Sequence, residues 1–378
     1  MPASITSLDQ VVSGLAPQGR ERFDRLYDFV LSTAEVRPPG AMDGWITKAF
    51  RYLSAAPPDT DAWREEILER IRHQRVVHVV NRATGQATLF NAVRALRPIE
   101  ARDESDVAKK VEEARAKCSF CRPLELTPAN TFGRIGLDKT CANVAVYDGY
   151  HGLVIFKDHS PLRFRHDDFR PEEIADLLAT SRAWAEKARA EDPAARFFFL
   201  MWNCLWKAGA SIIHGHAQMT VGRKFHYGKV EALRRSARAY AAEHGADYFA
   251  DLVAVHKALG LAAEWDGVTA LAHLVPTKER EIILVADRFD APGLPKAVWR
   301  ALKVYAAQDV KSYNLAVYMP PLGDPDPAWK GFPVLVHLVD RGDPSAATAD
   351  IGAMELYASA VVSSDPFVLA EAMKKQSD

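Results

Sequence analysis

The sequence has few cysteines, no excess of charge of either sign and no long apolar run. Only 4 of its 378 residues are cysteine, which is too few for a disulfide scaffold. Its 48 basic residues nearly balance its 49 acidic residues, so the chain lacks the basic field that binds nucleic acid or an anionic membrane. We find no signal peptide and no apolar segment that could span a bilayer. The sequence therefore predicts a cytoplasmic protein that has neither nucleic acid nor a membrane as a partner.

The hydrophobic pattern divides the chain into three parts. Residues 1–74 carry apolar side chains at helical spacing, and we expect a helical N-terminal extension there. Residues 75–227 combine short β-forming runs with one long helical stretch. Residues 228–378 repeat the order helix, strand, strand in outline, which indicates an internal duplication. Helices and strands mixed in this way predict an α+β fold.

Local patterns predict the individual elements. In the first part we expect a helix over residues 20–31 and a second helix after the capping residue Thr60. In the second part we expect a helix over residues 170–191 and strands over 76–80, 87–93, 143–146, 151–156 and 197–203. In the third part we expect helices over 228–243, 247–259 and 294–310 and strands over 268–275, 281–285, 312–319 and 333–340.

Two histidines and a glutamine alternate in an otherwise apolar run, as His214, His216 and Gln218. Side chains two apart in a strand point to the same face, so we expect these three to line one side of a sheet. Such a row is often no more than a solvated strand face. The small residues between them would, however, let a bulky anion approach. Upstream stand Asn203, at the end of a β-forming run, and Ser211, in a Gly-Ala-Ser sequence.

Cys118 and Cys121 form a C-x-x-C pair. Such a pair alone is compatible with a redox site, half of a metal site or chance. His159 and His214 are candidates for the two missing ligands, and the four residues would make a Cys2His2 set for tetrahedral zinc. A set of four protein ligands leaves no position for water, so the predicted zinc is structural. It would hold in place the segment that carries His216.

These motifs resemble those of the histidine-triad superfamily, and in particular its galactose-1-phosphate uridylyltransferase branch. The pattern that carries the resemblance is an asparagine, then Gly-Ala-Ser, then His-x-His-x-Gln. Similar Arg-x-x-Arg-Pro and C-x-x-C motifs accompany this pattern in the uridylyltransferases. The resemblance implies a duplicated histidine-triad domain, in which helices pack on mostly antiparallel sheets. It also implies a homodimer.

The resemblance points to substrate-binding residues as well. Arg94 and Arg97 alone could be a solvated rim or a clamp for phosphate or a base. In the uridylyltransferases the corresponding arginines lie beside the nucleotide, and so do the residues that correspond to Asn130 and Phe132. Glu355 corresponds to a glutamate that contacts the hexose. The resemblance therefore implies that these five residues bind substrate.

The third part of the chain departs from the family pattern. Ala349 and Val361 stand where the family usually has a lysine and a glutamine for the hexose phosphate. The second copy of the triad keeps only His337 and has no glutamine at the triad spacing. We expect His337 to be a core residue or a ligand of a second metal rather than a nucleophile. One half would carry the chemistry and the other would be a platform.

The proposed chemistry follows from what an imidazole can do. A neutral imidazole is a competent nucleophile near pH 7. We predict that His216 attacks the α-phosphorus of a nucleotide sugar or another nucleoside diphosphate compound, which gives a covalent nucleotidyl-histidine and ping-pong kinetics. A backbone carbonyl should hold the other ring nitrogen. Gln218 and Ser211 would donate hydrogen bonds to the phosphate oxygens, and Asn203 would orient them.

The sequence thus predicts a nucleotidyltransferase, most simply one that moves UMP from a UDP-hexose to a hexose 1-phosphate. In a close alternative the acceptor is inorganic phosphate, and the enzyme is a phosphorylase of a nucleotide sugar or a dinucleoside polyphosphate. The missing acceptor lysine favours this alternative. A non-catalytic nucleotide-binding scaffold is a second alternative, from a different class of protein.

Overall fold

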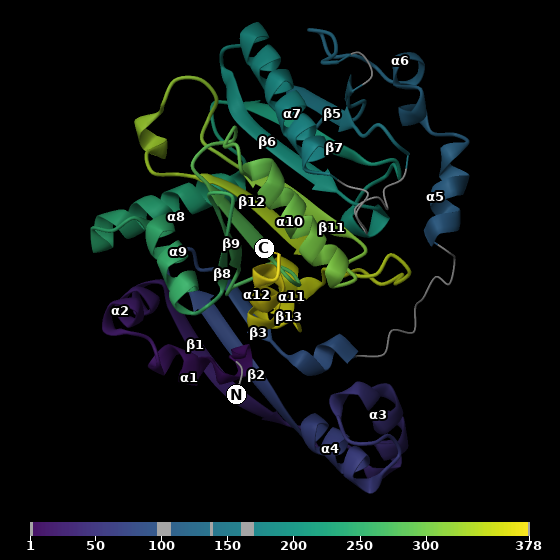
Figure 1. The fold of residues 1–378 in the computed structure, drawn as a ribbon, viewed down its shortest axis with the longest axis vertical. Helices are drawn as coiled ribbons and strands as arrows, with labels where there is room; N and C mark the ends of the chain where they lie inside the picture. The colour runs from purple at the N-terminus through teal and green to yellow at the C-terminus, as the bar shows by residue number, and fades with distance from the viewer. Residues whose placement is uncertain (1–2, 97–106, 137–138, 160–169, 377–378) are drawn as a thin grey trace.

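The computed structural model describes residues 3–96, 107–136, 139–159 and 170–376. Over these residues it confirms an α+β fold built on two sheets (Figure 1). The larger sheet has the strand order β4-β5-β7-β6-β11-β12-β10-β9-β8, and the smaller sheet has the order β1-β2-β3-β13. All neighbouring strands described in the larger sheet are antiparallel. In the smaller sheet, β13 pairs with β3 in parallel. The part of the chain that the structure describes contains no helix that is long and apolar enough to cross a membrane.

The strands of the smaller sheet are β1 Tyr27–Glu35, β2 His73–Asn81, β3 Ala87–Phe90 and β13 Ala360–Val362. The strands of the larger sheet are β4 Thr140–Ala142, β5 Tyr150–Ile155, β6 Ala195–Asn203, β7 His216–Arg223, β8 Ala262–Trp265, β9 Val268–Ala272, β10 Ile282–Ala286, β11 Tyr313–Tyr318 and β12 Val334–Asp340. The helices are α1 Leu8–Ser13, α2 Pro17–Leu26, α3 Asp43–Ala49, α4 Asp61–Arg72, α5 Val107–Arg115, α6 Pro123–Leu126, α7 Pro171–Glu191, α8 Gly228–His244, α9 Tyr248–Ala258, α10 Leu294–Ala307, α11 Ala353–Tyr357 and α12 Pro366–Lys374.

The larger sheet joins the two copies of the repeated pattern. The order α7, β6, β7 in the first copy recurs as α10, β11, β12 in the second, as predicted. The two copies meet where β6 pairs with β11, and α7 contacts α10 (Figure 1). One continuous apolar core runs through both copies, from Trp184 on α7 to Tyr305 on α10. The two halves therefore share one core and one sheet.

The predicted helix over residues 20–31 is wrong beyond Leu26, where β1 begins. From Tyr27 to Leu31 the apolar residues also alternate, which suits a strand. These residues form a strand and not a helix because β2, which is far away in the sequence, pairs with them. Tyr27, for example, lies opposite Asn81. The N-terminal extension, expected to be helical, thus contributes an edge strand to the smaller sheet. Helices α3 and α4 lie at the far end of the β1–β2 hairpin (Figure 1).

Two further strands differ from the prediction. The strand expected over residues 143–146 lies instead at Thr140–Ala142, and Val144 is 85% exposed. Apolar residues in the segment after β4 therefore do not mark a buried strand. Strand β8 was not predicted, although it pairs with β9 in a short hairpin. The predicted hairpin over residues 76–93 is confirmed as β2 and β3, with Val77 opposite Phe90.

The register of the larger sheet decides which side chains share a face. Gln218 on β7 lies opposite Leu153 on β5 and opposite Met201 on β6. Opposite residues in neighbouring strands point to the same face. The other face of the sheet carries Gly152, which is covered by the indole of Trp184 on α7. The side chains of His216 and Gln218 are therefore on the face away from α7.

Candidate active site and metal centre

Cys118, Cys121, His159 and His214 lie together, and their donor atoms are all within 4.8 Å of one another. Cys118 Sγ is 3.4 Å from His214 Nδ1, and Cys121 Sγ is 3.3 Å from His159 Nδ1. Tetrahedral zinc holds a thiolate and an imidazole donor about 3.6 Å apart, because its bonds to sulfur and nitrogen are about 2.3 and 2.1 Å long. The spacing of the four donors therefore fits a zinc-sized ion.

Backbone carbonyls orient both histidines of this cluster. His214 Nε2 donates to the carbonyl of Phe156 at 2.7 Å, and His159 Nε2 donates to the carbonyl of Val111 at 3.0 Å. A proton on Nε2 leaves the lone pair on Nδ1, which is the atom that faces the thiols. Burial lowers the pKa of His214 to about 4. The ring is thus neutral at pH 7, as a metal ligand must be.

His216 is the first residue of β7, and only 5% of its surface is exposed. Its Nδ1 donates to the backbone carbonyl of His214 at 2.8 Å, so the lone pair is on Nε2. This is the carbonyl contact that a histidine nucleophile needs. The ring of Phe120 packs edge-on against His216, with ring centres 5.2 Å apart. Burial lowers the pKa of His216, which keeps the ring neutral and nucleophilic at pH 7.

The predicted row of three polar side chains is shorter than expected. Because β7 begins at His216, His214 lies outside the strand and only His216 and Gln218 share a strand face. The glycine between the histidines also has a different role from the one we expected. A Cβ at Gly215 would lie 2.5 Å from the ring of Phe156. The small residue therefore makes room for a side chain of the protein, not for a substrate.

Gln218 is buried and bonded to His151. The backbone N–H of Tyr147 donates to His151 Nδ1 at 3.1 Å, so the ring proton is on Nε2. That N–H lies 3.0 Å from Gln218 Oε1 and donates to it. Because Gln218 Oε1 is occupied, the amide NH2 group is the end that can donate to a substrate oxygen. Burial lowers the pKa of His151, which favours the neutral tautomer that this arrangement needs.

Asn203 and Ser211 complete the predicted catalytic set. The register of β6 and β7 pairs Trp202 with Ala217, and one step further places Asn203 beside His216. Asn203 Oδ1 accepts a hydrogen bond from Asn314 Nδ2 at 2.7 Å. Ser211 lies exposed in the loop that leads to β7. Asn314 lies directly opposite Asn203, at the start of β11.

Asn130 and Phe132, predicted to lie beside the nucleotide, contact helix α7. Asn130 Oδ1 accepts a hydrogen bond from the indole of Trp184 at 2.8 Å. The ring of Phe132 packs against the same indole, with ring centres 5.8 Å apart. Trp184 covers Gly152 on the face of the sheet that does not carry Gln218. These contacts do not bring the two residues to the histidines, and their role beside a nucleotide stays a prediction.

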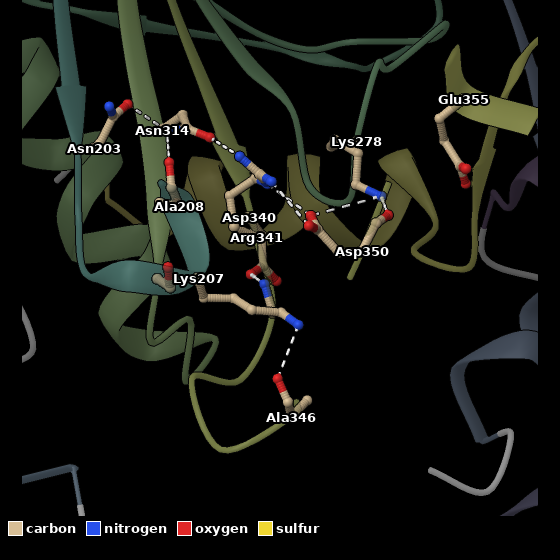
Figure 2. A network of polar contacts seen from close by, with 12 residues as sticks. Asn203, Lys207, Ala208, Lys278, Asn314, Asp340, Arg341, Ala346, Asp350 and Glu355 are labelled. Atoms are coloured by element: carbon tan, nitrogen blue, oxygen red, sulfur yellow. Dashed lines mark hydrogen bonds and ion pairs between the residues drawn. The ribbon is translucent and has the colours of Figure 1, made fainter. Parts of the chain in front are cut away.

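Arg94 and Glu355 line a cavity of about 240 Å³, whose other lining residues come mostly from the second half of the chain. Ala349 and Val361 line it too, together with residues of the network in Figure 2. Glu355 Oε2 accepts a hydrogen bond from the backbone N–H of Gly352 and so caps its own helix. Figure 2 shows Glu355 well apart from Asn203. Arg97 lies outside the described residues.

A larger cavity, of about 710 Å³, borders the loop that carries Ser211. Gly209 and Ile213 from this loop line it, as do Lys207, Arg341 and Asp350, which also line the smaller cavity. His216 itself lines neither of these cavities. His337, the remaining triad histidine of the second copy, bonds through Nδ1 to Glu281 Oε1 at 3.0 Å. His337 is partly buried, and the buried carboxylate of Glu281 holds it.

Comparisons with known proteins were made on sequence and on structure. No family model matches the sequence, and no curated protein matches it. An ADP-glucose phosphorylase from Arabidopsis thaliana with bound ADP-glucose superposes with a TM-score of 0.58 at 18% identity, over 78% of this chain and 96% of that one. A galT-like protein from the same plant gives 0.55 at 18% identity, over 68% of this chain and 91% of that one. A uridylyltransferase gives 0.52 at 15% identity, over 66% of this chain and 88% of that one.

The chain shares the fold of these three proteins. The predicted resemblance to the uridylyltransferase branch of the histidine-triad superfamily is thus confirmed as a resemblance of fold. The structure of the phosphorylase contains bound ADP-glucose, so that protein of the same fold binds a nucleotide sugar. At this level of identity the likeness shows a shared fold and not a shared activity.

The sequence did not indicate the contacts by which three residues hold the predicted ones in place, namely His151, Asn314 and Arg341. His151 contacts Gln218 across two neighbouring strands, and only the strand register could have indicated this. Asn314 and Arg341 belong to the second half, which carries no recognisable motif at these positions.

Proposed function

We propose that this protein is a nucleotidyltransferase that works through a nucleotidyl intermediate on His216. The observation that carries the proposal is the hydrogen bond from His216 Nδ1 to the carbonyl of His214. It leaves the lone pair on Nε2 of a buried, neutral ring. Gln218 and Asn203 lie on the same sheet face with their carboxamide oxygens occupied. Their NH2 groups are then the ends available to a phosphate.

In the first step, His216 Nε2 attacks the α-phosphorus of a nucleoside diphosphate compound. A phosphorus–nitrogen bond forms, and the bond from phosphorus to the bridging oxygen breaks. The distal phosphate, with any sugar that it carries, leaves with the electron pair. The imidazolium keeps its Nδ1 proton on the carbonyl of His214, which stabilises the positive charge.

In the second step, a phosphate oxygen of the acceptor attacks the same phosphorus. The phosphorus–nitrogen bond breaks and its electron pair returns to Nε2, which restores the neutral ring. Both steps pass through transition states with charge on the non-bridging oxygens. Donors aimed at those oxygens lower the barrier, and we assign this role to Gln218, Asn203 and Ser211.

We propose that zinc binds Cys118, Cys121, His159 and His214, and that its role is structural. The four-ligand set is closed, so a bound zinc ion would link the ligand segments without taking part in the transfer. His214 then has two functions. Its ring binds the metal, and its backbone carbonyl orients the nucleophile. Loss of the metal should therefore affect His216 directly.

We propose a nucleotide sugar as the donor and either of two acceptors. Transfer of UMP from a UDP-hexose to a hexose 1-phosphate is the reaction that the triad motif implies. Inorganic phosphate as acceptor is supported by two observations. Ala349 and Val361, which replace the phosphate-binding lysine and glutamine, line the cavity beside Glu355. An ADP-glucose phosphorylase has the same fold.

The test is a covalent labelling experiment. The protein is incubated with UDP-glucose or ADP-glucose labelled in the α-phosphate, without acceptor, and acid-labile label on the protein is measured. We expect label on wild type and on His73→Ala, an exposed histidine on β2, but none on His216→Ala. Chasing the labelled protein with phosphate or with a hexose 1-phosphate identifies the acceptor. No label with either donor would favour a nucleotide-binding scaffold over an enzyme.

A further inference from the structure

A side-chain network connects the second half of the molecule to the predicted catalytic asparagine (Figure 2). Asn314 on β11 donates through Nδ2 to Asn203 Oδ1 at 2.7 Å and to the carbonyl of Ala208 at 2.9 Å. Arg341, just after β12, donates through Nη1 to Asn314 Oδ1. The network thus contacts both Asn203 and the loop that carries Ser211.

The chemistry of its partners fixes the orientation of Asn314. A guanidinium can only donate and a backbone carbonyl can only accept. Asn314 must therefore turn Oδ1 toward Arg341 and Nδ2 toward Ala208. Since Nδ2 also faces Asn203, Asn203 must present its own Oδ1 to Asn314. The NH2 group of Asn203 is then free to point at a substrate.

Arg341 is itself held rigidly. Its Nε and Nη2 donate to the two carboxylate oxygens of Asp350 at 2.6 and 2.8 Å, which is a bidentate pair. Lys278 Nζ lies 3.8 Å from the same carboxylate and donates to the Asp350 carbonyl. The side chains of Arg341 and Asp350 are both largely buried. Breaking such a pair is costly, so the guanidinium stays where it can orient Asn314.

We propose that Asn314 is a positioning residue for nucleotidyl transfer, and that Arg341 and Asp350 hold it. It keeps the Asn203 amide turned with NH2 toward the phosphate that His216 attacks. A rotated amide would present a carbonyl oxygen to a negatively charged oxygen and would raise the barrier. Asn314 also fixes the loop before Ser211 through the carbonyl of Ala208. The second half, which has no triad, therefore orients the NH2 group of Asn203. This inference deepens the function proposed above and rests on it.

Asn314→Asp tests this inference with almost no change of shape. An aspartate at this position keeps the acceptor for Arg341 but has no N–H for Asn203. Asn203 should then rotate to donate to the new carboxylate and turn its oxygen to the substrate. We expect the rate of label transfer to His216 to fall by roughly tenfold to a hundredfold. A loss of this size is typical when a residue that orients a functional side chain through a hydrogen bond is replaced. KM for the donor should change little, because the lost interaction acts on charge that develops during transfer.

A double-mutant cycle separates orientation from a merely structural effect. In an Asn203→Ala background there is no amide left to orient, so adding Asn314→Asp should change the rate by less than about threefold. Asn91→Asp is the matched control, since Asn91 is a partly buried asparagine whose Nδ2 donates to the side chain of Gln74. It should label at the wild-type rate. Thermal unfolding of each variant is measured alongside.

The outcomes distinguish the inference from the function on which it rests. If wild type forms the adduct and Asn314→Asp forms it equally fast, the positioning role is wrong and the transferase stands. The same holds if Asn314→Asp slows labelling equally with and without Asn203. If wild type forms no adduct with any donor, the transferase falls, and the positioning role falls with it. A rate loss that appears only when Asn203 is present supports the inference.

Discussion

The backbone carbonyl of His214 accepts a hydrogen bond from Nδ1 of His216 at 2.8 Å. The residue whose ring faces the two thiols thus sets the orientation of its neighbour. A change at the proposed metal site should therefore affect the proposed nucleophile, His216, because only one residue separates it from His214. This coupling gives the first prediction.

Cys121→Ser should lose the bound metal and most of the nucleotidyl transfer. A serine hydroxyl is a poor zinc ligand, and without the metal the segment around His214 is held less firmly. We expect a lower thermal midpoint and a fall in adduct formation on the order of tenfold or more. Metal content is measured by mass spectrometry. Cys141→Ala, a buried cysteine outside the ligand set, should keep its metal; retention of metal by Cys121→Ser would contradict the assigned ligands.

His151→Leu should slow adduct formation without loss of the metal. The variant removes the N–H that occupies Gln218 Oε1, so the amide is no longer held with NH2 toward the substrate. A single neutral hydrogen bond contributes about 0.5–1.5 kcal/mol, which corresponds to roughly a threefold to tenfold effect on rate. His151→Gln retains an N–H donor and should recover part of the rate. Equal rates for His151→Leu and wild type would show that Gln218 does not depend on this contact.

His226 should make the protein less stable in acid. Burial lowers its pKa to about 4, from an ordinary value of 6.5. Between these pH values the unfolded chain binds a proton that the folded chain does not, so the free energy of unfolding falls as the pH falls. The slope for one proton is up to about 1.4 kcal/mol per pH unit, and the contribution is fully present above pH 6.5.

Urea unfolding of His226→Phe measures this contribution. The substituted ring can keep the packing against Phe197 and Trp329, while the titrating group is gone. The midpoint should fall less between pH 6.5 and 4 than it does in wild type. A wild-type slope in His226→Phe would mean that other groups control acid unfolding.

Gly152→Ala should destabilise the fold. A Cβ at this position would lie 2.5 Å from the indole of Trp184, which is fully buried and hydrogen-bonded to Asn130. The indole cannot move aside freely, and we expect a loss of about 1–3 kcal/mol. Gly44→Ala places a methyl group in open space on helix α3 and should be neutral or slightly stabilising. Thermal midpoints of the two variants give the comparison.

The Cys2His2 cluster could be predicted from the sequence because its residue types are few and chemically specific. Cys118 and Cys121 needed two more ligands, and the histidines that complete the set are the ones expected. The elements of the larger sheet were also predictable for the most part, since helix α7 and strand β6 have strong local patterns. Local periodicity was sufficient for these longer elements, but not for the short strand β8, although its residues also alternate in burial.

The rest depends on contacts between distant segments. Local spacing predicts a helix over residues 27–31, where strand β1 begins, because the partner strand β2 follows only after helices α3 and α4 in the sequence. The pairing of Asn314 with Asn203 follows from the register of β11 on β6, which no local pattern encodes. A recognisable motif does not always predict contacts either. Asn130 and Phe132 belong to such a motif, but the contacts they make are with Trp184.

The pairing of β13 with β3 has a consequence for synthesis of the chain. Residues 360–362 complete the smaller sheet beside Thr88 and Phe90, and Asp365 accepts a hydrogen bond from the hydroxyl of Ser4 at 2.6 Å. Until residues 360–365 are synthesised, β3 has an open edge and Ser4 lacks its partner Asp365. The smaller sheet therefore closes only after this segment has left the ribosome, and until then the exposed edge of β3 needs protection from other chains.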